Sequence, residues 1–366
     1  MHSKPPMTEP PFIKSRSKFK QMGRRKPLVS GGEPKRDVGI DGAFACLDNS
    51  PQGQIIMRHT RAIADGLDIP LNIIHVMEGT NPERGPSDPI QWQIKHQEAK
   101  DYLRRILNEE HQHSTGYDHI LLNGIVGDEI SRWANDHRGS LIVMRSRCGL
   151  PETTGHNSRQ HNYLGDAARQ LLEGSTASLL LVPPDAPEMI STAYKRLLVP
   201  LDGSQRAESV LPLAMRIARK HGAELTLAHV VPEPEIVETG PHDKEAHDLM
   251  EHMLRYNEQN ARAYLDRLQA RLNTDSLVVR TVLESDGDPR ERLLALSSRQ
   301  DADLIVMSAH GRTGMTGMSC GNIARHIATH TRIPLLMIRQ QGNLLPNYRE
   351  VSKYGSDRRI FWESAH

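Results

Sequence analysis

A glycine-rich stretch near the carboxyl end of the chain has the residue types and spacing of an anion-binding loop. Residues 304–322 read LIVMSAHGRTGMTGMSCGN and contain Gly311, Gly314, Gly317 and Gly321. Because glycine has no Cβ, its backbone N–H group can approach a phosphate closely. The stretch therefore predicts a phosphate-binding loop, although a simple tight connection between two elements would also be rich in glycine.

Two apolar segments flank this loop and would position it. Four consecutive apolar residues, Leu304 to Met307, fit a strand that is buried on both faces. After the loop, Asn322 begins a helical pattern that includes Ile323 and Ile327. The first turn of a helix offers free backbone N–H groups and a partial positive charge. A strand, a glycine loop and a helix start would together bind an anion.

The first half of the chain matches the second half element by element. Five pairs of segments carry the match: ACLDNS (45–50) and VPLDGS (199–204), LNIIHV (71–76) and LTLAHV (225–230), GD (127–128 and 287–288), LIVM (141–144 and 304–307), and GDAAR (165–169) and GNIAR (321–325). The separation between partners changes only in the connections, where insertions are tolerated. The sequence therefore predicts a tandem repeat of one structural unit.

Each repeat alternates strands with helices. In the first repeat we expect strands near 43–48, 70–77, 117–123, 140–145 and 178–183. In the second repeat we expect strands near 196–201, 224–231, 276–283, 303–308 and 334–339, and helices near 205–221, 245–272, 288–299 and 322–330. Such alternation is typical of an α/β fold. We predict two tandem Rossmann-like domains, each with a five-stranded parallel sheet flanked by helices.

The domain boundaries follow from composition. Residues 1–41 carry ten Lys or Arg and four acids without periodicity, which predicts a disordered basic arm. That arm is either a solvated tail or a tether for nucleic acid or anionic lipid. We place the first domain at 42–183, a proline-containing linker at 184–194, the second domain at 195–339 and a polar tail at 340–366.

Overall composition is that of an ordinary globular protein. The 366 residues are 37% hydrophobic and 25% charged, with a formal net charge of +1 and no apolar run long enough to span a membrane. Three cysteines without C-x-x-C spacing predict a reducing, cytoplasmic setting. Cys320, near the predicted helix start, is either an inert small residue or a reactive thiol.

The carboxyl ends of the strands in the second repeat gather the candidate ligand residues. In an open parallel sheet, ligands bind outside the strand ends where the strand order reverses. A carboxylate, a glycine loop and a helix N-terminus suit a nucleotide, with its base and ribose near the carboxylate and its phosphates on backbone N–H groups. The candidate residues are Pro200, Asp202, Val230, Met307, Ser308, His310, Gly311, Arg312, Gly321, Asn322 and Ile323.

The order of the motifs VPLDGS, HVV, GDP, LIVMSAHGRTG and CGN resembles the universal stress protein family. Members of that family that bind ATP carry a loop of the form G-x-x-G-x(9)-G-(S/T). Here the loop reads Ser308, two residues, Gly311, nine residues, Gly321 and Asn322. The resemblance covers most of 43–183 and 195–339. It implies a fold like that of the adenine nucleotide alpha hydrolases, binding of ATP with or without Mg²⁺, and a regulatory role in the stress response.

The resemblance also implies how the two repeats pair. Domains of this family pair through their last strands, which here are Leu179 to Val182 and Leu335 to Ile338. We therefore expect an internal pseudo-dimer, and a homodimer of whole chains and an unidentified protein partner are compatible with it. Such apolar edge strands need covering.

Two alternatives to a nucleotide-responsive regulator stay open. One is a nucleotide-free scaffold that acts through the internal pseudo-dimer. The other is a weak enzyme for ATP hydrolysis or nucleotidyl transfer, for which His310 beside Arg312 offers the only base in the loop. We assign no catalytic residue and no metal ligand, because the sequence contains no H-E-x-x-H or P-loop motif.

The first repeat departs from the family pattern at the equivalent loop. It reads Arg145-Ser-Arg-Cys148, and sixteen residues instead of nine precede Gly165. Asp166 would either repel a phosphate or act as a helix N-cap. We expect that this repeat does not bind ATP in the family manner, and that Arg145 and Arg147 are solvated or bind a different anion.

Overall fold

The structure, a computed structural model, describes residues 39–50, 52–78, 89–110, 118–147, 164–187, 189, 191–233, 244–273, 277–285, 287–312 and 320–339. The predicted tail and nearly all of the predicted basic arm lie outside these residues, as do Gly314, Gly317 and Cys148. Every element described below belongs to the compact unit that begins at Asp37.

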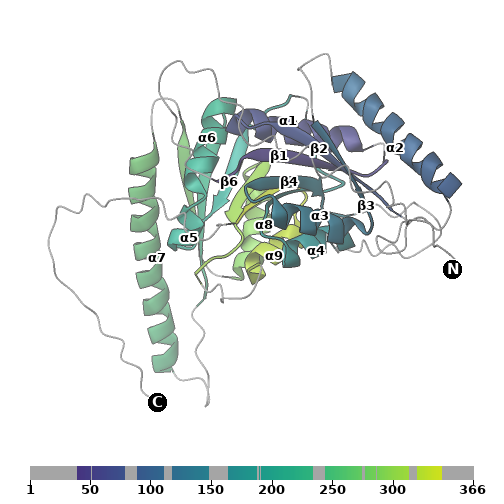
Figure 1. The fold of residues 1–366 in the computed structure, drawn as a ribbon. Coiled ribbons are helices and arrows are strands. Elements are labelled where there is room, and N and C mark those ends of the chain that lie inside the picture. The colour runs from purple at the N-terminus through teal and green to yellow at the C-terminus, as the bar shows by residue number, and fades with distance from the viewer. Residues whose placement is uncertain are drawn as a thin grey trace, which may run out of the picture. The chain divides into compact units, whose positions relative to one another are not determined.

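Strands and helices alternate along both repeats, as predicted (Figure 1). The first repeat consists of β1 (Gly42–Leu47), α1 (Gly53–Leu67), β2 (Leu71–Met77), α2 (Pro89–Glu110), β3 (Asp118–Asn123), α3 (Val126–Asp136), β4 (Ser140–Arg145), α4 (Asp166–Gly174) and β5 (Ser178–Val182). The second consists of β6 (Arg196–Pro200), α5 (Gln205–Glu208), α6 (Leu211–His221), β7 (Glu224–Val231), α7 (Lys244–Leu272), β8 (Val279–Ser285), α8 (Pro289–Arg299), β9 (Leu304–Ser308), α9 (Asn322–His330) and β10 (Leu335–Ile338).

One predicted helix is two helices in the structure. The helical pattern over 205–221 is interrupted between α5 and α6, after Glu208. Pro212 occupies the first turn of α6. A proline ring collides with the carbonyl group four residues earlier, here that of Glu208, and proline has no N–H to donate to it. A single continuous helix is therefore excluded, and proline is well tolerated where α6 begins.

The two repeats share one ten-stranded sheet, whose order within the described residues is β3-β2-β1-β4-β5-β10-β9-β6-β7-β8. The five strands of each repeat are parallel to one another. The repeats meet where β5 and β10 pair antiparallel, with Leu180 opposite Leu336. The predicted pairing through the last strands is thus confirmed. Each repeat reverses its strand order between its first and fourth strands.

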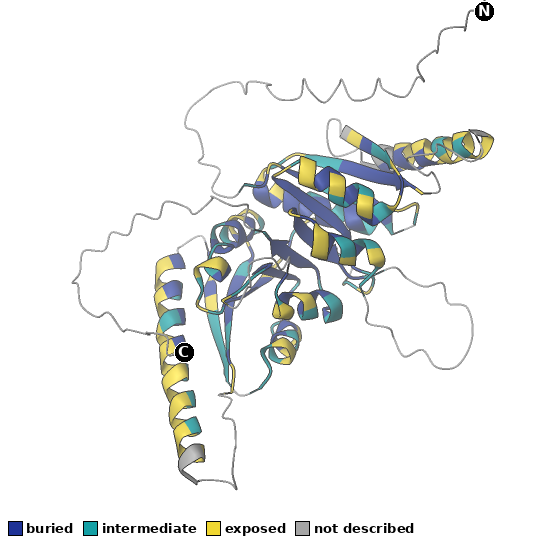
Figure 2. Cartoon of the chain, turned by 60° about the horizontal axis from the view of Figure 1, so that its bottom comes forward, coloured by how far each residue is buried: buried dark blue, intermediate teal, exposed yellow. Residues whose placement is uncertain are grey.

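Helices cover both faces of the sheet (Figure 2). On one face, buried side chains of α1, α2, α6 and α7 form a single hydrophobic cluster, and on the other face those of α3, α4, α8 and α9 form a second. Successive strand residues alternate between the clusters, as Leu141 and Ile142 do, because side chains of a strand point to opposite faces in turn. Each cluster includes residues of both repeats, so the core is continuous where the repeats meet.

The structure corrects one match between the repeats. Gly124, with φ of 140°, and Gly287, with φ of 122°, each lie two residues before the helix that follows the third strand. Residues with a side chain rarely adopt such φ values, so both positions favour glycine. Gly287 therefore corresponds to Gly124, and the match of Gly127-Asp128 to Gly287-Asp288 is wrong. Gly124 and Gly287 also have the same separation as Leu141 and Leu304, so no insertion lies between this glycine and the fourth strand.

The predicted linker ends in a buried tyrosine that joins the two repeats. Tyr194 is 1% exposed, and its hydroxyl lies 2.9 Å from Nδ1 of His59 in α1. The Tyr194 backbone N–H donates to Nδ1 of His221 in α6 over 3.2 Å. The helices α1 and α6 pack closely here, since a Cβ on Gly66 would lie 3.2 Å from Nε2 of His221. Helix packing thus supplements the strand pairing between the repeats.

Candidate functional site

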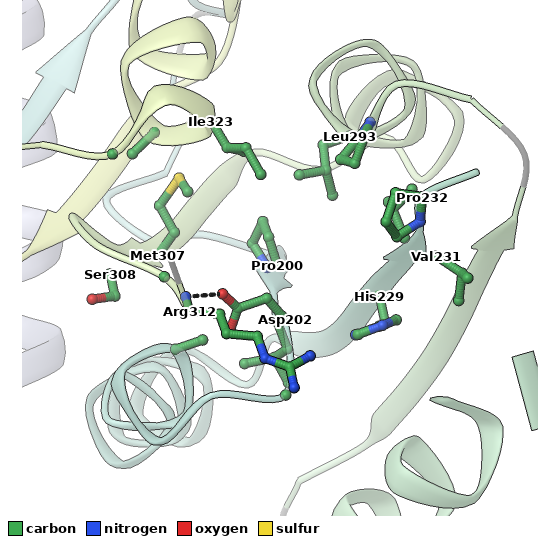
Figure 3. Close-up of a pocket in the computed structure, with 18 of the residues that line it drawn as sticks. Pro200, Asp202, His229, Val231, Pro232, Leu293, Met307, Ser308, Arg312 and Ile323 are labelled. Carbon is green, nitrogen blue, oxygen red and sulfur yellow. Dashed lines mark hydrogen bonds between the residues drawn. The ribbon is translucent and has the colours of Figure 1, made fainter. Parts of the chain in front are cut away.

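A cavity of about 910 Å³ lies at the carboxyl ends of β6, β7 and β9. Its volume is in the range of small-molecule and cofactor sites. All eleven candidate residues line it: Pro200, Asp202, Val230, Met307, Ser308, His310, Gly311, Arg312, Gly321, Asn322 and Ile323. Figure 3 shows Ser308 and Arg312 on one side of the cavity and His229 and Pro232 on the other. The sequence argument from strand ends therefore brought together residues that are neighbours in space.

Asp202 ties the end of β6 to the glycine loop. Its Oδ1 accepts hydrogen bonds from the backbone N–H and the hydroxyl of Ser204, at 3.0 and 2.6 Å. Its Oδ2 accepts from the backbone N–H of Arg312 at 2.5 Å, which is the dashed line in Figure 3. Burial by itself raises the pKa of Asp202, but these hydrogen bonds more than offset it, so the pKa is lowered. Asp202 is therefore a carboxylate at neutral pH.

Asp202 limits the space for a side chain at Gly311. A Cβ at this position would overlap Oδ2 of Asp202, and Gly311 does not have a positive φ. At Gly321, by contrast, the nearest atom to an added Cβ would be the Ala309 carbonyl oxygen at 3.5 Å, an ordinary contact. Among these loop glycines, it is Gly311 whose missing side chain permits the close approach of the loop to Asp202.

Ser308 occupies the loop position where the ATP-binding pattern of the motif has glycine, and its side chain fits there without strain. Ser308 is 9% exposed and does not have a positive φ, so its side chain causes no backbone strain. Its hydroxyl accepts a hydrogen bond from the backbone N–H of His310 at 3.4 Å. The substitution therefore keeps the turn that leads from β9 into the loop.

Helix α9 begins at the cavity without a side-chain cap. Its N-cap residue is Gly321, and Asn322 and Ile323 of its first turn line the cavity. N–H groups in the first turn of a helix have no partner within the helix, and here no side chain caps them. They can donate to an anion in the cavity.

The structure also places residues in the cavity wall that sequence reasoning missed. Helix α7 contributes four side chains at helical spacing, and α8 and the end of β7 contribute others. Periodicity could identify the face of α7 but not that it stands beside these strand ends, because no motif marks it. The missed residues include Asn257, Asn260, Ala261 and Tyr264 of α7, Pro289 and Leu293 of α8, and His229, Val231 and Pro232.

In the first repeat, an arginine lies where the second repeat has Ser308. Nη1 of Arg145 is 3.5 Å from Oδ2 of Asp48, the counterpart of Asp202. Arg147 donates from Nη2 to the carbonyl oxygen of Thr331 at 2.7 Å. Their side chains are only 15% and 11% exposed, so the expectation of solvated arginines is wrong.

The structure also tests the predictions for Asp166 and Cys320. The N-cap of α4 is Gly165 and not Asp166, whose side chain is 94% exposed at the first helical position. Cys320 is 1% exposed and burial raises its pKa to about 11, which favours the inert alternative over a reactive thiol. Within the described ranges, no three His, Cys, Asp or Glu side chains form a group that could hold a metal ion.

The candidate site and the fold define the class of this protein. Each repeat is a Rossmann-like unit with the strand order 3-2-1-4-5, and the second carries a cavity where that order reverses. The model of the universal stress protein family matches residues 44–183 and again residues 193–339. The chain therefore belongs to the universal stress protein family, as a tandem of two of its domains. No helix in the described part of the chain is long and apolar enough to cross a membrane.

Known relatives include both tandem and shorter proteins. A universal stress protein of Mycobacterium tuberculosis is 21% identical over 308 residues, which cover 82% of this chain and 96% of the relative. One of Methanocaldococcus jannaschii is 24% identical over 151 residues, which cover 40% of this chain and 83% of the relative. A crystal structure of a universal stress protein from Archaeoglobus fulgidus covers 84% of this chain and 99% of its own, with a TM-score of 0.56 and 18% identity. That similarity supports the tandem fold.

Proposed function

We propose that the second repeat binds an adenine nucleotide, ATP first of all, and that the protein is a nucleotide-responsive regulator of the stress response. Occupancy of the cavity would change the pose of a surface that a protein partner recognises. The observation that carries the proposal is the convergence of Asp202, the glycine loop and the uncapped start of α9 on one cavity.

The loop side of the cavity suits the phosphates. The first-turn N–H groups of α9 supply donors and the positive end of a helix. Arg312 is exposed at the cavity, and a guanidinium can bind phosphate oxygens with two parallel hydrogen bonds. A bound ATP would bring Mg²⁺ with it, held mainly by its own phosphates, as is usual for this ion.

Two polar atoms in the cavity wall support occupancy by a polar ligand. Nδ1 of His229 and the hydroxyl of Tyr264 are buried, and neither makes a hydrogen bond of good geometry. The Leu201 carbonyl oxygen and the Glu208 carboxylate nonetheless lie near enough to interact with them. Because a poorly paired buried polar group is costly, a ligand or a water with hydrogen-bonding atoms would stabilise this cavity.

The test is calorimetric titration of the full chain with ATP and Mg²⁺. We expect saturable binding by the wild type and at least a tenfold loss, about 1.4 kcal/mol, in Gly311→Ala, because the added Cβ pushes the loop off Asp202. Gly174→Ala is the matched control, since a Cβ there meets nothing within 4 Å. Circular dichroism confirms that each variant is folded.

The outcomes separate the hypotheses. Absence of binding by the folded wild type would contradict the proposal and leave the scaffold alternative. Binding that is unchanged in Gly311→Ala would show that the ligand does not use the loop. Steady release of inorganic phosphate in the same samples, lost in His310→Ala while binding persists, would support the weak-enzyme alternative.

A further inference from the structure

Helix α7 forms one wall of the cavity with side chains that no nucleotide motif includes. Asn257, Asn260, Ala261 and Tyr264 all line the cavity. Their spacing of three, four and seven residues from Asn257 places them on one face of the helix. Further along the same helix, Leu265 and other apolar residues are buried in the core. The buried end of α7 therefore holds the cavity-lining face in place.

Two carboxamides on this face are free to bind a ligand. Asn257 and Asn260 are exposed, and neither side chain has a hydrogen bond to another described residue. A carboxamide offers two N–H donors and a carbonyl acceptor, and it carries no charge. This combination matches the edge of a nucleobase, where donors and acceptors lie side by side.

The first repeat has different residues at the same two positions. His75 and Tyr102 lie with ring centroids 6.0 Å apart, and His229 and Tyr264 lie 6.1 Å apart, which sets the correspondence between α2 and α7. Counting back from the tyrosines, Asn257 and Asn260 correspond to Lys95 and Glu98. Nζ of Lys95 donates to the carbonyl oxygen of Glu78 at 3.3 Å. The first repeat, whose loop departs from the family pattern, thus has charged side chains at the two positions where the second repeat has uncharged amides.

The carboxamides share a helix face with Tyr264, whose ring packs against that of His229 with centroids 6.1 Å apart. Figure 3 places His229 and Pro232 on the side of the cavity opposite Ser308. Val230, Val231 and Pro232 give this end an apolar lining that suits a planar ring. If the phosphates lie on the loop, the base would lie here.

We propose that Asn257 and Asn260 on α7 recognise the base of the bound nucleotide by hydrogen bonds to its edge, and that this pair selects a 6-aminopurine. The inference rests on the proposed function. An asparagine binds adenine well because its acceptor and donor meet the 6-amino group and an adjacent ring nitrogen. Such a contact determines specificity and leaves phosphate binding unaffected.

The experiment titrates the full chain with three probes: ATP, purine riboside triphosphate, which lacks the 6-amino group, and inorganic triphosphate, which lacks the nucleoside. The variant is Asn257→Ala with Asn260→Ala, and the matched control is Gln259→Ala, an exposed carboxamide on α7 outside the cavity lining. Alanine is the best helix former, so α7 persists in all variants. We expect the double variant to bind ATP at least tenfold more weakly and inorganic triphosphate as the wild type does.

Discrimination between the two nucleotides gives a sharper readout. The wild type and Gln259→Ala should prefer ATP over purine riboside triphosphate, and the double variant should lose most of that preference. If the wild type binds ATP and the double variant binds it equally well, the inference is wrong and the proposed function stands. Equal losses for ATP and inorganic triphosphate would also overturn it, because they would indicate displacement of the loop. If the wild type binds no nucleotide, both proposals fail.

Discussion

At the scale of single residues, one position separates the two repeats most clearly. Ser308 and Arg145 are the last residues of β9 and β4. The small serine leaves room beside Asp202 for the loop and the cavity. The arginine instead reaches Asp48 and is largely buried against it. A charged side chain of the protein itself thus neutralises the carboxylate that, in the second repeat, we expect to face a ligand.

Cys320 provides a prediction at the same scale. Burial raises its pKa to about 11 from a usual value of 9.0, so the thiolate needed for alkylation is about 100-fold rarer than for a free cysteine at pH 8. We expect iodoacetamide to modify Cys320 at least 100-fold more slowly in the native protein than in urea. Peptide mapping by mass spectrometry measures this residue separately from the other two cysteines. Equal native and denatured rates would contradict the buried position.

At the scale of elements, α9 is held at its carboxyl end by the other repeat. Its first turn lies at the cavity, and the carbonyl oxygen of Thr331, its C-cap, accepts the hydrogen bond from Arg147 of the other repeat. In the opposite direction, Arg339 donates to carbonyl oxygens at the end of α4, among them that of Leu171 at 3.3 Å. A cation at the carboxyl end of a helix is favourable because of the helix dipole. Arg147, which follows the fourth strand of the first repeat, therefore helps to position the helix that faces the ligand cavity.

Removal of this contact has a predictable effect on stability. Arg147→Ala should lower the free energy of unfolding by about 1–2 kcal/mol, since a charge-assisted, largely buried hydrogen bond is lost. Arg169→Ala is the control, because its pairs with Asp166 and Glu173 are on the surface and surface ion pairs contribute about 0–1 kcal/mol. Urea unfolding measures both. Equal midpoints for the two variants would show that Arg147 does not hold α9.

At the scale of the whole described unit, the two repeats form one body. A shared sheet, two shared hydrophobic clusters and the buried Tyr194 join them. Two histidines, His59 and His221, lie against Tyr194 between the repeats, and burial lowers the pKa of each. The pKa of His59 falls to about 4 from 6.5.

These histidines make stability depend on pH. Because the folded pKa of His59 is below the unfolded one, the unfolded chain binds more protons, and stability is complete above about pH 6.5 and falls as the pH approaches 4. Between pH 7 and pH 5, His59 should contribute a loss of about 2 kcal/mol. His59→Gln keeps a hydrogen-bonding partner for Tyr194 and should flatten this slope in urea unfolding. His247→Gln, at an exposed position of α7, should leave the slope unchanged.

Much of the architecture could be predicted from local patterns. Apolar runs and helical periodicity predict every described strand and helix of the second repeat except the break before Pro212, which periodicity does not reveal. The eleven candidate residues could be chosen because parallel strands bring their carboxyl ends to one edge. Their role in binding ATP stays a prediction that the experiments above address.

By itself, the sequence determined the repeat, the parallel α/β fold and the strand ends where a ligand would bind, because periodicity and motif order are properties of neighbouring residues. Only the tertiary structure decided which distant side chains share a space. It placed Arg145 against Asp48, Arg147 against Thr331 and α7 beside the cavity. It also replaced the match at Gly127 with one at Gly124, where backbone geometry requires glycine. These contacts join residues far apart in the chain, and packing alone selects them.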